Sequence, residues 1–284
     1  MKVIFVCTGN TCRSPLAEGY LKSFGIKDLT VESRGIFADG SKVSENSEKV
    51  AQEYGFDISH HVSSPFSEND LNADMIITMS QSHLEMLKAI GLQNERLSVL
   101  ANGIPDPFGA NESVYRYCAN QIFDSIDSLA FGGSFTDYRI VDLEKRHIDD
   151  MVRIEKEEFS LPWSKESILD SIKNGYIFFA AVDKNNRLIG YAGINTVLDE
   201  GYIANIAVDK EYRNKGIATL LINRLFVLAR KKGLSFVTLE VRASNITAVS
   251  LYEKCGFKFE GRRKNFYFKP VEDAIIMTRR FNFK

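Results

Sequence analysis

The stretch that most constrains the fold is the octapeptide Cys-Thr-Gly-Asn-Thr-Cys-Arg-Ser at residues 7–14. It directly follows the apolar run Val3–Val6, which is typical of a buried strand. After Pro15, apolar residues recur at helical spacing and predict that a helix begins here: Leu16, Tyr20, Leu21 and Phe24. The octapeptide is therefore expected to be a loop from the carboxyl end of a strand to the N-terminus of a helix. Open α/β sheets bind their ligands at such loops.

The residue types of this loop suit a phosphoryl group. Backbone N–H groups of a tight turn can surround an anion, and the dipole of the following helix adds positive potential. Gly9 and Asn10 tolerate left-handed backbone conformations, and the planar guanidinium of Arg13 can hold two phosphoryl oxygens. Cys7 would lie in this positive field, which favours the thiolate, the nucleophilic form of cysteine.

The loop thus predicts phosphoryl transfer, with Cys7 and Arg13 as catalytic residues. Phosphate or substrate is expected to contact the rest of the loop: Thr8, Gly9, Asn10, Thr11, Cys12 and Ser14. A nucleotide P-loop is excluded, because no Gly-Lys-Ser/Thr closes the loop. The alternative is a buried structural cysteine beside a solvated arginine. That alternative does not explain why a strand is followed by Cys, five residues, Arg, Ser and the start of a helix.

This loop resembles that of the low-molecular-weight protein tyrosine phosphatase family, and the resemblance covers residues 1–131. A second family motif, Asp106-Pro107-Phe108, lies late in the same stretch. The resemblance implies that Asp106 is the general acid, whereas a plain turn aspartate is the alternative. Thr11 and Cys12 make the loop most similar to the bacterial protein-arginine phosphatases, because tyrosine-specific members usually carry a bulkier aliphatic residue at Thr11. The implied substrate is a phosphorylated protein, with phosphoarginine preferred over phosphotyrosine.

The four cysteines have no secretory signal before them, which indicates a reducing, cytoplasmic location. Cys12 either packs in the interior or, as the resemblance to arginine phosphatases implies, forms a disulfide with Cys7 on oxidation. Arsenate reduction is disfavoured, since it needs a further cysteine pair and only Cys118 follows in this half. No apolar run approaches the about 18–20 residues of a membrane span, so no membrane partner is expected.

Length and charge predict two domains. A chain of 284 residues suggests about two. Residues 1–134 carry 10 Lys/Arg against 17 Asp/Glu, and residues 135–284 carry 26 against 20, so a net charge of −7 is followed by one of +6. Gly132-Gly133-Ser134 is typical of a linker or a helix end. We therefore expect domains at 1–131 and 137–284, joined by a linker at 132–136.

Strands alternate with helices in the first half and predict an α/β, doubly wound parallel sheet. The expected strands are 3–6, 29–33, 73–79 and 96–100, and the expected helices after the first are 46–54, 81–90 and 112–131, the last with Val114, Tyr117, Cys118, Ile122 and Ile126 on one side. His60 and His61 have no carboxylate or cysteine at ligand spacing, so a surface loop and no metal site is expected there.

In the second half a mixed sheet with helices on both faces is expected, with strands at 138–141, 176–182, 188–194, 202–208, 236–241 and 273–279 and helices at 147–159, from 162, at 215–232 and at 245–254.

Small and basic residues open the helix expected at 215–232 and suit a pyrophosphate. That pattern alone is weak, but the segments 239–245 and 251–257 are informative: Leu-Glu-Val-Arg-Ala-Ser-Asn and Leu-Tyr-Glu-Lys-Cys-Gly-Phe. With Pro162-Trp163-Ser164 and residues 273–277, they closely resemble the RimI-type ribosomal-protein-alanine N-acetyltransferases of the GNAT superfamily over residues 137–280. The resemblance implies acetyl-CoA as cosubstrate, held by Ile206, Ala207, Val208, Asn214, Lys215, Gly216, Ile217, Ala218, Thr219 and Asn245.

The chemistry of acetyl transfer fits two further residues. An α-ammonium has a pKa of about 7.7–8.0, so a modest base such as Glu240 can deprotonate it. Tyr252 can protonate the departing CoA thiolate. A sheet-edge glutamate and a core tyrosine are the alternatives. The implied partner is a ribosomal protein N-terminus, that of small-subunit protein eighteen; another protein or a small amine is the alternative. The run Arg262–Tyr267 would border the peptide groove, and direct nucleic-acid binding is not required.

Overall fold

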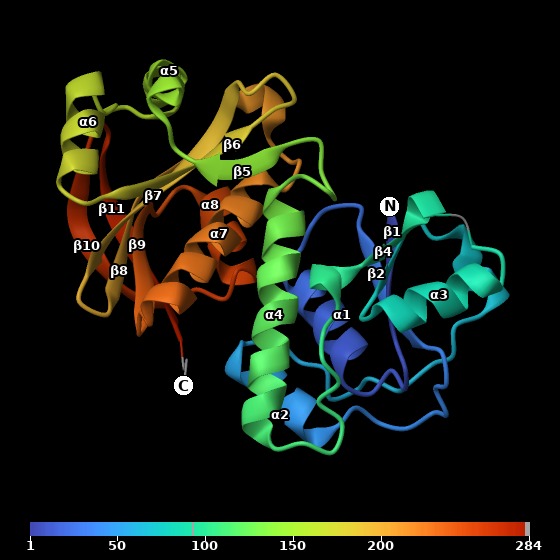
Figure 1. Cartoon of the computed structure of the whole chain (residues 1–284). Helices are drawn as coiled ribbons and strands as arrows, with labels where there is room; N and C mark the ends of the chain where they lie inside the picture. Colours follow the sequence, from blue (N-terminus) through green and yellow to red (C-terminus); the bar gives the residue numbers. More distant parts are fainter. Residues whose placement is uncertain (93, 282–284) are drawn as a thin grey trace. The chain divides into compact units, whose positions relative to one another are not determined.

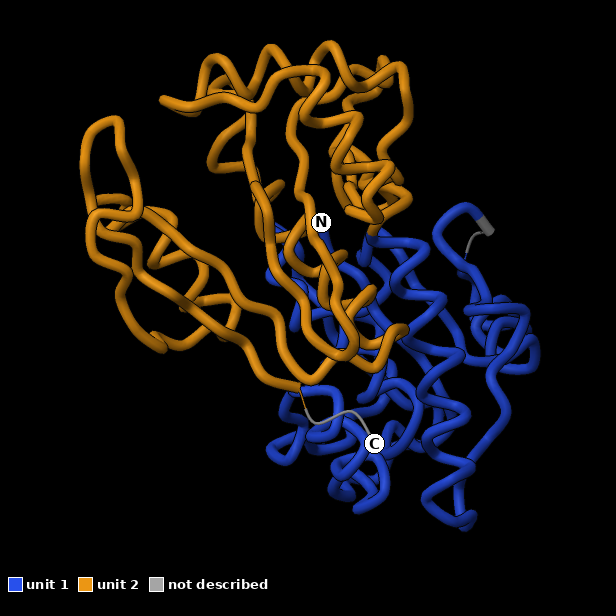
Figure 2. The backbone as a smooth tube through the Cα atoms, turned by 90° about the vertical axis from the view of Figure 1, so that its left-hand side faces the viewer, with its two compact units in different colours: residues 1–130, 284 blue, residues 131–283 orange. Residues whose placement is uncertain are grey.

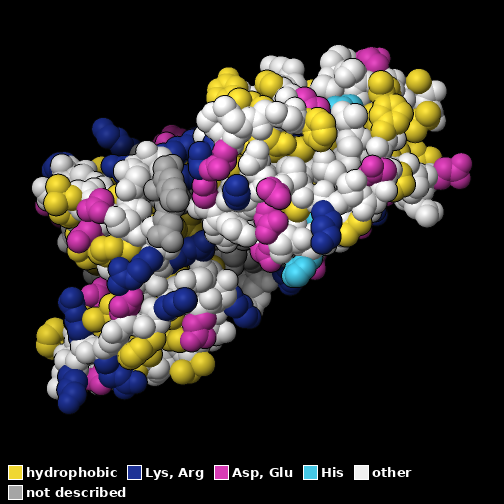
Figure 3. Space-filling view, turned by 90° about the horizontal axis from the view of Figure 1, so that it is seen from below, with side chains coloured by type: hydrophobic (Ala, Val, Ile, Leu, Met, Phe, Trp, Pro, Cys, Tyr) yellow, Lys and Arg dark blue, Asp and Glu magenta, His cyan; other side chains and the backbone are white. Residues whose placement is uncertain are grey.

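The computed structural model describes residues 1–92 and 94–281, and the chain forms two compact units. One unit comprises Met1–Ala130, and the other begins at Phe131 (Figure 2). The first contains a four-stranded sheet and the second a seven-stranded sheet, so the α/β class with two domains is confirmed. Residues 282–284, the end of the expected second domain, lie outside the described residues. Both signs of charge are interspersed with hydrophobic side chains on the face drawn in Figure 3.

The first unit alternates strands and helices (Figure 1). Its elements are β1 (Lys2–Cys7), α1 (Arg13–Ser23), β2 (Thr30–Gly35), α2 (Glu45–Glu53), η1 (Glu68–Asn72), β3 (Met75–Thr78), α3 (Gln81–Ala89), η2 (Asn94–Arg96), β4 (Leu97–Val99), η3 (Leu100–Asn102) and α4 (Glu112–Phe131). The strands are all parallel, in the order β2-β1-β3-β4. Because β1 pairs with β2 on one side and β3 on the other, the loop after β1 lies where the strand order reverses, which is the usual ligand position.

Apolar side chains fill both faces of this sheet. Ile4 and Val6 of β1 pack with Leu84 and Leu87 of α3 on one face. On the other, Tyr20 of α1 stacks on Phe123 of α4 with ring centroids 4.1 Å apart.

One face of α4 was predicted wrongly. Val114 and Tyr117 are 37% and 60% exposed, whereas Tyr115 and Phe123 are buried with Cys118, Ile122 and Ile126. The buried stripe follows the 3.6-residue period through Tyr115, Cys118 and Ile122, and position 117 falls outside it.

The second unit contains β5 (Arg139–Asp142), η4 (Lys145–His147), α5 (Ile148–Glu158), α6 (Lys165–Lys173), β6 (Ile177–Val182), β7 (Leu188–Val197), β8 (Glu200–Val208), η5 (Lys210–Tyr212), α7 (Ile217–Lys232), β9 (Phe236–Arg242), α8 (Ile246–Lys254), β10 (Lys258–Phe268) and β11 (Val271–Arg280). The strand order is β10-β11-β9-β8-β7-β6-β5, and β8–β9 is the parallel pair. Phe178 of β6 packs against α5 and α6, while the next residue, Phe179, lies under Arg224 of α7. Since successive strand residues face opposite ways, helices cover both faces, as the sequence predicted.

The strand β10 had not been predicted. It pairs antiparallel with β11 at the edge of the sheet and contains the basic and aromatic run 262–267. Nearly all its side chains are exposed, so the alternation of buried and exposed residues that marks a strand is absent. No helix among the described residues is long and apolar enough to cross a membrane.

Candidate active sites

The loop after β1 is held in shape by Asn10. Asn10 is fully buried and has a left-handed backbone, with φ of 55°. Gly9, the other residue expected to use this conformation, does not. The Asn10 amide donates to Ser14 Oγ at 2.9 Å and to Ser33 Oγ at 2.8 Å, and its oxygen accepts from the Ser64 N–H at 2.9 Å. One side chain therefore ties the loop to α1, to β2 and to the segment at 64.

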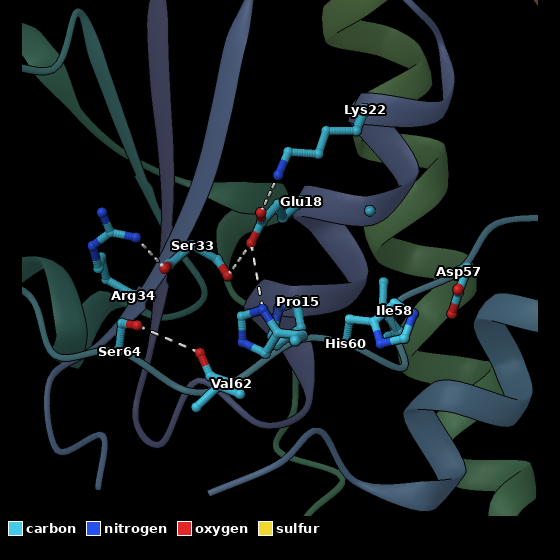
Figure 4. Close-up of a pocket in the computed structure, with 12 residues that line it drawn as sticks. Pro15, Glu18, Lys22, Ser33, Arg34, Asp57, Ile58, His60, Val62 and Ser64 are labelled. Atoms are coloured by element: carbon cyan, nitrogen blue, oxygen red, sulfur yellow. Dashed lines mark hydrogen bonds and ion pairs between the residues drawn. The ribbon is translucent and has the colours of Figure 1, made fainter. Parts of the chain in front are cut away.

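A cavity of about 390 Å³ lies beside this network (Figure 4). Its lining includes Ser33 and Ser64, and the Ser33 hydroxyl donates to Glu18 at 2.5 Å. His61 also lines it, and its Nε2 is 3.0 Å from the Asn10 carbonyl oxygen. The segment is a surface loop, as expected, with His60 and Val62 exposed, but the His61 side chain folds back onto the Asn10 backbone.

Cys7 ends β1 and is buried. Its sulfur accepts from the Asn10 N–H at 3.3 Å and lies 3.0 Å from the Ser14 hydroxyl. That hydroxyl accepts from the Asn10 amide, and its own hydrogen has two acceptors within reach, the Cys7 sulfur at 3.0 Å and the Arg34 carbonyl at 3.3 Å. The loop thus holds the Cys7 sulfur between a backbone N–H and a hydroxyl.

Arg13 begins α1, and its side chain is only 5% exposed. Nη1 donates to the Ile104 carbonyl at 3.0 Å, and Nη2 donates to Asp106 Oδ2 at 2.6 Å. Nε is buried and has no hydrogen-bond partner among the described residues. The guanidinium is thus fixed in place with a donor left for a further acceptor.

Asp106 is brought to the loop from 93 residues away. It lies between two prolines, and its other oxygen accepts from the Phe108 N–H at 3.2 Å. The carboxylate is 47% exposed and can reach a bound molecule from the solvent side. Cys118 donates to the Pro105 carbonyl at 3.4 Å and anchors this turn, and burial raises the pKa of its thiol.

The remaining loop residues differ in how they are held. Cys12 is a free, buried thiol 3.3 Å from the Tyr115 hydroxyl, and burial raises the pKa of Tyr115 to about 12. The Thr11 carbonyl accepts from the Ser44 N–H at 2.9 Å. Its hydroxyl, in contrast, has one hydrogen-bond partner among the described residues, the Cys12 sulfur at 3.6 Å.

Sequence reasoning missed His83 of α3, whose Nε2 lies 2.9 Å from Thr8 Oγ1. Burial, with the positive charge of Arg13 adding to it, lowers the pKa of His83. Nothing in the local sequence marks this histidine, because its contact depends on the packing of α3 beside β1.

In the second unit β8 and β9 diverge. They pair only over Glu200–Tyr202 and Phe236–Thr238. Beyond this, Ile206, Ala207 and Val208 pair with β7 alone among the described strands. Their backbone groups on the β9 side are left for another hydrogen-bonding chain, and a pantetheine arm carries such amides.

The loop before α7 has an unusual backbone. Asn214 and Gly216 have φ of 61° and 83°, and α7 begins at Ile217, two residues later than predicted. Lys215 is held by the Tyr138 hydroxyl, which donates to its carbonyl at 3.2 Å. Ala218 and Thr219 lie in the first helical turn, so consecutive N–H groups and the dipole are available to a phosphate.

Glu240 and Tyr252 occupy β9 and α8. The Glu240 carboxylate is 29% exposed and lies 3.3 Å from Arg263 Nη1 of β10. Tyr252 is buried, and burial raises its pKa well above the usual range, so its hydroxyl stays protonated at neutral pH. Asn245, expected to contact CoA, uses its side-chain oxygen to accept from the Ala248 N–H at 3.1 Å and so caps α8.

Glu155 of α5 is a second residue missed from the sequence. It is completely buried, accepts from the Asn205 amide at 2.7 Å and from the Trp163 N–H at 2.9 Å, and is bonded by the Tyr191 hydroxyl. It ties the segment before α6 to β8, next to the diverging edge.

Two family models match the chain. Low molecular weight phosphotyrosine protein phosphatase matches residues 2–137, and the Acetyltransferase (GNAT) family matches residues 148–257. A low molecular weight protein-tyrosine-phosphatase, PtpB of Staphylococcus haemolyticus, is 40% identical over 136 residues, which are 45% of this chain and 97% of that protein. The [ribosomal protein bS18]-alanine N-acetyltransferase of Escherichia coli K12 is 35% identical over 143 residues, 49% of this chain and 95% of that protein.

The chain belongs to both families, one in each half. The phosphatase half is also similar to the crystal structure of the YwlE arginine phosphatase from Geobacillus stearothermophilus, at 31% identity and a TM-score of 0.44, over 45% of this chain and 89% of that one. The geometry around Cys7 thus lies in a phosphatase domain, and that around Glu240 lies in a GNAT acetyltransferase domain. Acetyl-CoA is the cosubstrate that the GNAT family implies.

Proposed function

We propose that the chain is a bifunctional enzyme, with a protein phosphatase domain at 1–131, a linker at 132–136 and a protein N-terminal acetyltransferase domain at 137–284. The observation that carries the first activity is the meeting of Cys7, Arg13 and Asp106 at one strand end. The second activity rests on Glu240 and Tyr252 in the GNAT half, together with the diverging strands β8 and β9.

The phosphatase reaction has two steps. The Cys7 thiolate attacks phosphorus, an S–P bond forms, the bond to the leaving group breaks, and Asp106 gives that group its proton. Water then attacks the phosphocysteine and returns a proton to Asp106, and phosphate leaves as the S–P bond breaks. The unpartnered Nε of Arg13 and the loop N–H groups stabilise the charge on the phosphoryl oxygens.

We favour phosphoarginine over phosphotyrosine because of Thr11. A guanidinium has donors around its plane, and leaving one of them unpaired costs about 1–3 kcal/mol. The Thr11 hydroxyl is bonded only weakly, to a sulfur at 3.6 Å, and can accept from such a donor. A phenol ring gains instead from an aliphatic wall, which isoleucine would provide.

The test compares wild type with Thr11→Ile on phosphoarginine and phosphotyrosine peptides. The specificity role requires the ratio of phosphoarginine to phosphotyrosine turnover to fall by about tenfold or more. Thr11→Ser keeps the hydroxyl and should keep the ratio. An equal loss on both substrates would show that Thr11 only maintains the loop.

In the acetyltransferase domain Glu240 accepts a proton from the substrate α-ammonium, directly or through water. The free amine attacks the acetyl carbonyl, the C–N bond forms and the C–S bond breaks, and Tyr252 protonates the CoA thiolate while the second proton of the amine returns to Tyr252. Ile206, Ala207 and Val208 pair with the pantetheine arm, and the residues 214–219 surround the pyrophosphate. The Asn245 amide nitrogen, which has no hydrogen-bond partner among the described residues, can contact CoA while its oxygen caps α8.

The proposed protein substrate is the N-terminal alanine of ribosomal protein bS18, the substrate named for the Escherichia coli relative. Acetyl transfer to a peptide with a free N-terminal alanine should be efficient. A lysine ammonium has a pKa of about 10.4 and is harder to deprotonate than an α-ammonium by over two units. Efficient acetylation of internal lysines in an N-terminally blocked peptide would overturn this assignment.

A further inference from the structure

A buried histidine outside the proposed catalytic set contacts the phosphate-binding loop. His83 lies in the first turn of α3, and 5% of its surface is exposed. Its Nε2 is 2.9 Å from the hydroxyl of Thr8, the residue directly after the nucleophile. The same hydroxyl is 3.4 Å from Arg13 Nη2.

The donors and acceptors of these hydrogen bonds allow an arrangement with a neutral imidazole. Arg13 can only donate, so Thr8 Oγ1 accepts from it and can give its own hydrogen to His83 Nε2. The imidazole hydrogen is then on Nδ1, 2.8 Å from Ser80 Oγ. Ser80 also accepts from the His83 N–H at 3.3 Å, and its hydroxyl can donate to Ser82 Oγ at 2.8 Å. The imidazole in this arrangement is neutral.

A neutral imidazole is also what the surroundings favour. The charged groups that face His83 are Arg13 and Asp106, and burial with the Arg13 charge lowers the pKa of His83. A second cation beside Arg13 would repel the guanidinium and remove the acceptor that orients Thr8. The chain of hydrogen bonds from His83 through Thr8 to Arg13 therefore fixes the Thr8 rotamer and one edge of the Arg13 guanidinium.

We propose that His83 is a positioning residue of the phosphatase reaction, which acts through Thr8 to hold the Arg13 guanidinium in the plane that receives the phosphoryl group. The proposal rests on the proposed function of the Cys7 loop. His83 does not touch the substrate. It maintains the geometry of a group that does, as supporting side chains do around other reactive centres.

The test measures kcat and KM on para-nitrophenyl phosphate and the inhibition constant of inorganic phosphate. His83→Leu should lower kcat/KM about tenfold and weaken phosphate inhibition, because the Thr8 hydroxyl is no longer held against the Nη2 edge of the Arg13 guanidinium. His83→Gln should restore most of the loss, since its side-chain oxygen can take the place of Nε2 as acceptor. Gln81→Ala, an exposed change in the same helical turn, is the matched control and should stay within about twofold.

Thr8 tests the other end of the bond and keeps the proposal falsifiable if His83→Leu does not fold. Thr8→Val should cause a similar loss, Thr8→Ser should restore it, and the double variant Thr8→Val/His83→Leu should be little worse than either single one. The proposal would be overturned if the losses of the two single variants multiplied in the double variant, or if His83→Gln lost as much activity as His83→Leu. It would also be overturned if His83→Leu or Thr8→Val kept activity within about twofold of wild type. Cys7→Ser separates the two claims, because retained turnover in that variant would refute the catalytic loop and not the role of His83 alone.

Discussion

The stability of the phosphatase domain should depend on Asn10 in a way that glycine and alanine distinguish. Asn10 combines a left-handed backbone with three unshared side-chain hydrogen bonds inside the fold, and its Oδ1 also shares the His61 Nε2 donor with its own carbonyl. Asn10→Gly removes the hydrogen bonds and keeps the backbone unstrained. Asn10→Ala removes the same bonds and also places a Cβ in a conformation that costs about 1–2 kcal/mol.

The expected magnitudes follow from these contacts. Each lost hydrogen bond is worth about 1 kcal/mol net, so Asn10→Gly should lower the free energy of unfolding by about 3 kcal/mol. Asn10→Ala should lower it by about 4–5 kcal/mol, since the backbone term adds to the same loss. Turnover should fall in both variants, because Ser14 and the loop N–H groups lose their alignment with Cys7.

Native-state hydrogen exchange of the β1 amides would measure these values within the intact chain. Asn46 provides the matched control, because it lies in the helix α2, where glycine is worse than alanine by up to about 1 kcal/mol. The glycine variant should therefore be more stable than the alanine variant at position 10 and less stable than it at position 46. The reasoning would be refuted if Asn10→Ala and Asn10→Gly had the same free energy of unfolding, or if both were close to wild type.

Three further outcomes are expected. Asp106→Asn should lower phosphatase kcat about 100-fold, because the leaving group is no longer protonated, while Arg13 can still donate to the neutral amide oxygen; an unchanged kcat on a poor leaving group would contradict the role of Asp106. Tyr252→Phe should lower acetyltransferase kcat by about 100-fold with little change in stability, because no other described residue bonds the hydroxyl; equal losses of activity and thermal stability would point to packing instead. His147 Nδ1 accepts from the Glu144 N–H at 3.1 Å, and burial lowers the pKa of His147. The stability that the neutral imidazole contributes is therefore present above about pH 6.5, the usual pKa of histidine, and is lost as pH falls through the lowered pKa of the folded state. His147→Asn keeps an acceptor that does not titrate, so the stability of this variant should fall less between about pH 7.5 and pH 5 than that of wild type. Urea unfolding followed by the fluorescence of the single tryptophan measures this difference. An equal fall in both proteins would show that His147 is not its source.

The strands and helices of the interior could be predicted from periodicity, and the loop at residues 7–14 from its local residue types. Both depend on neighbours in sequence, which a single chain displays directly. The strand β10 could not be predicted, because an edge strand exposed along most of its length has no alternating pattern. The face of α4 was misassigned by counting apolar residues, among them the exposed Tyr117, without following the helical period.

The supporting residues of the sites could not be predicted for a different reason. His83 reaches Thr8 across 75 residues, and Glu155 reaches Asn205 across 50. Such contacts are set by which helix packs on which strand, and a histidine or glutamate in an amphipathic helix is more often on the solvent side. Asp106 could be placed at the loop only by family resemblance, since its ion pair with Arg13 spans 93 residues.

The central claim is that one chain carries two separate active sites, and a crosswise comparison of two variants tests it. Wild type, Cys7→Ser and Glu240→Gln would each be assayed on a phosphoarginine peptide and on a peptide with an N-terminal alanine plus acetyl-CoA. Cys7→Ser should abolish phosphatase turnover and leave acetyl transfer within about twofold, and Glu240→Gln should do the reverse, because sites in separate domains that share no residue should behave independently. Loss of both activities in either folded variant would contradict the claim.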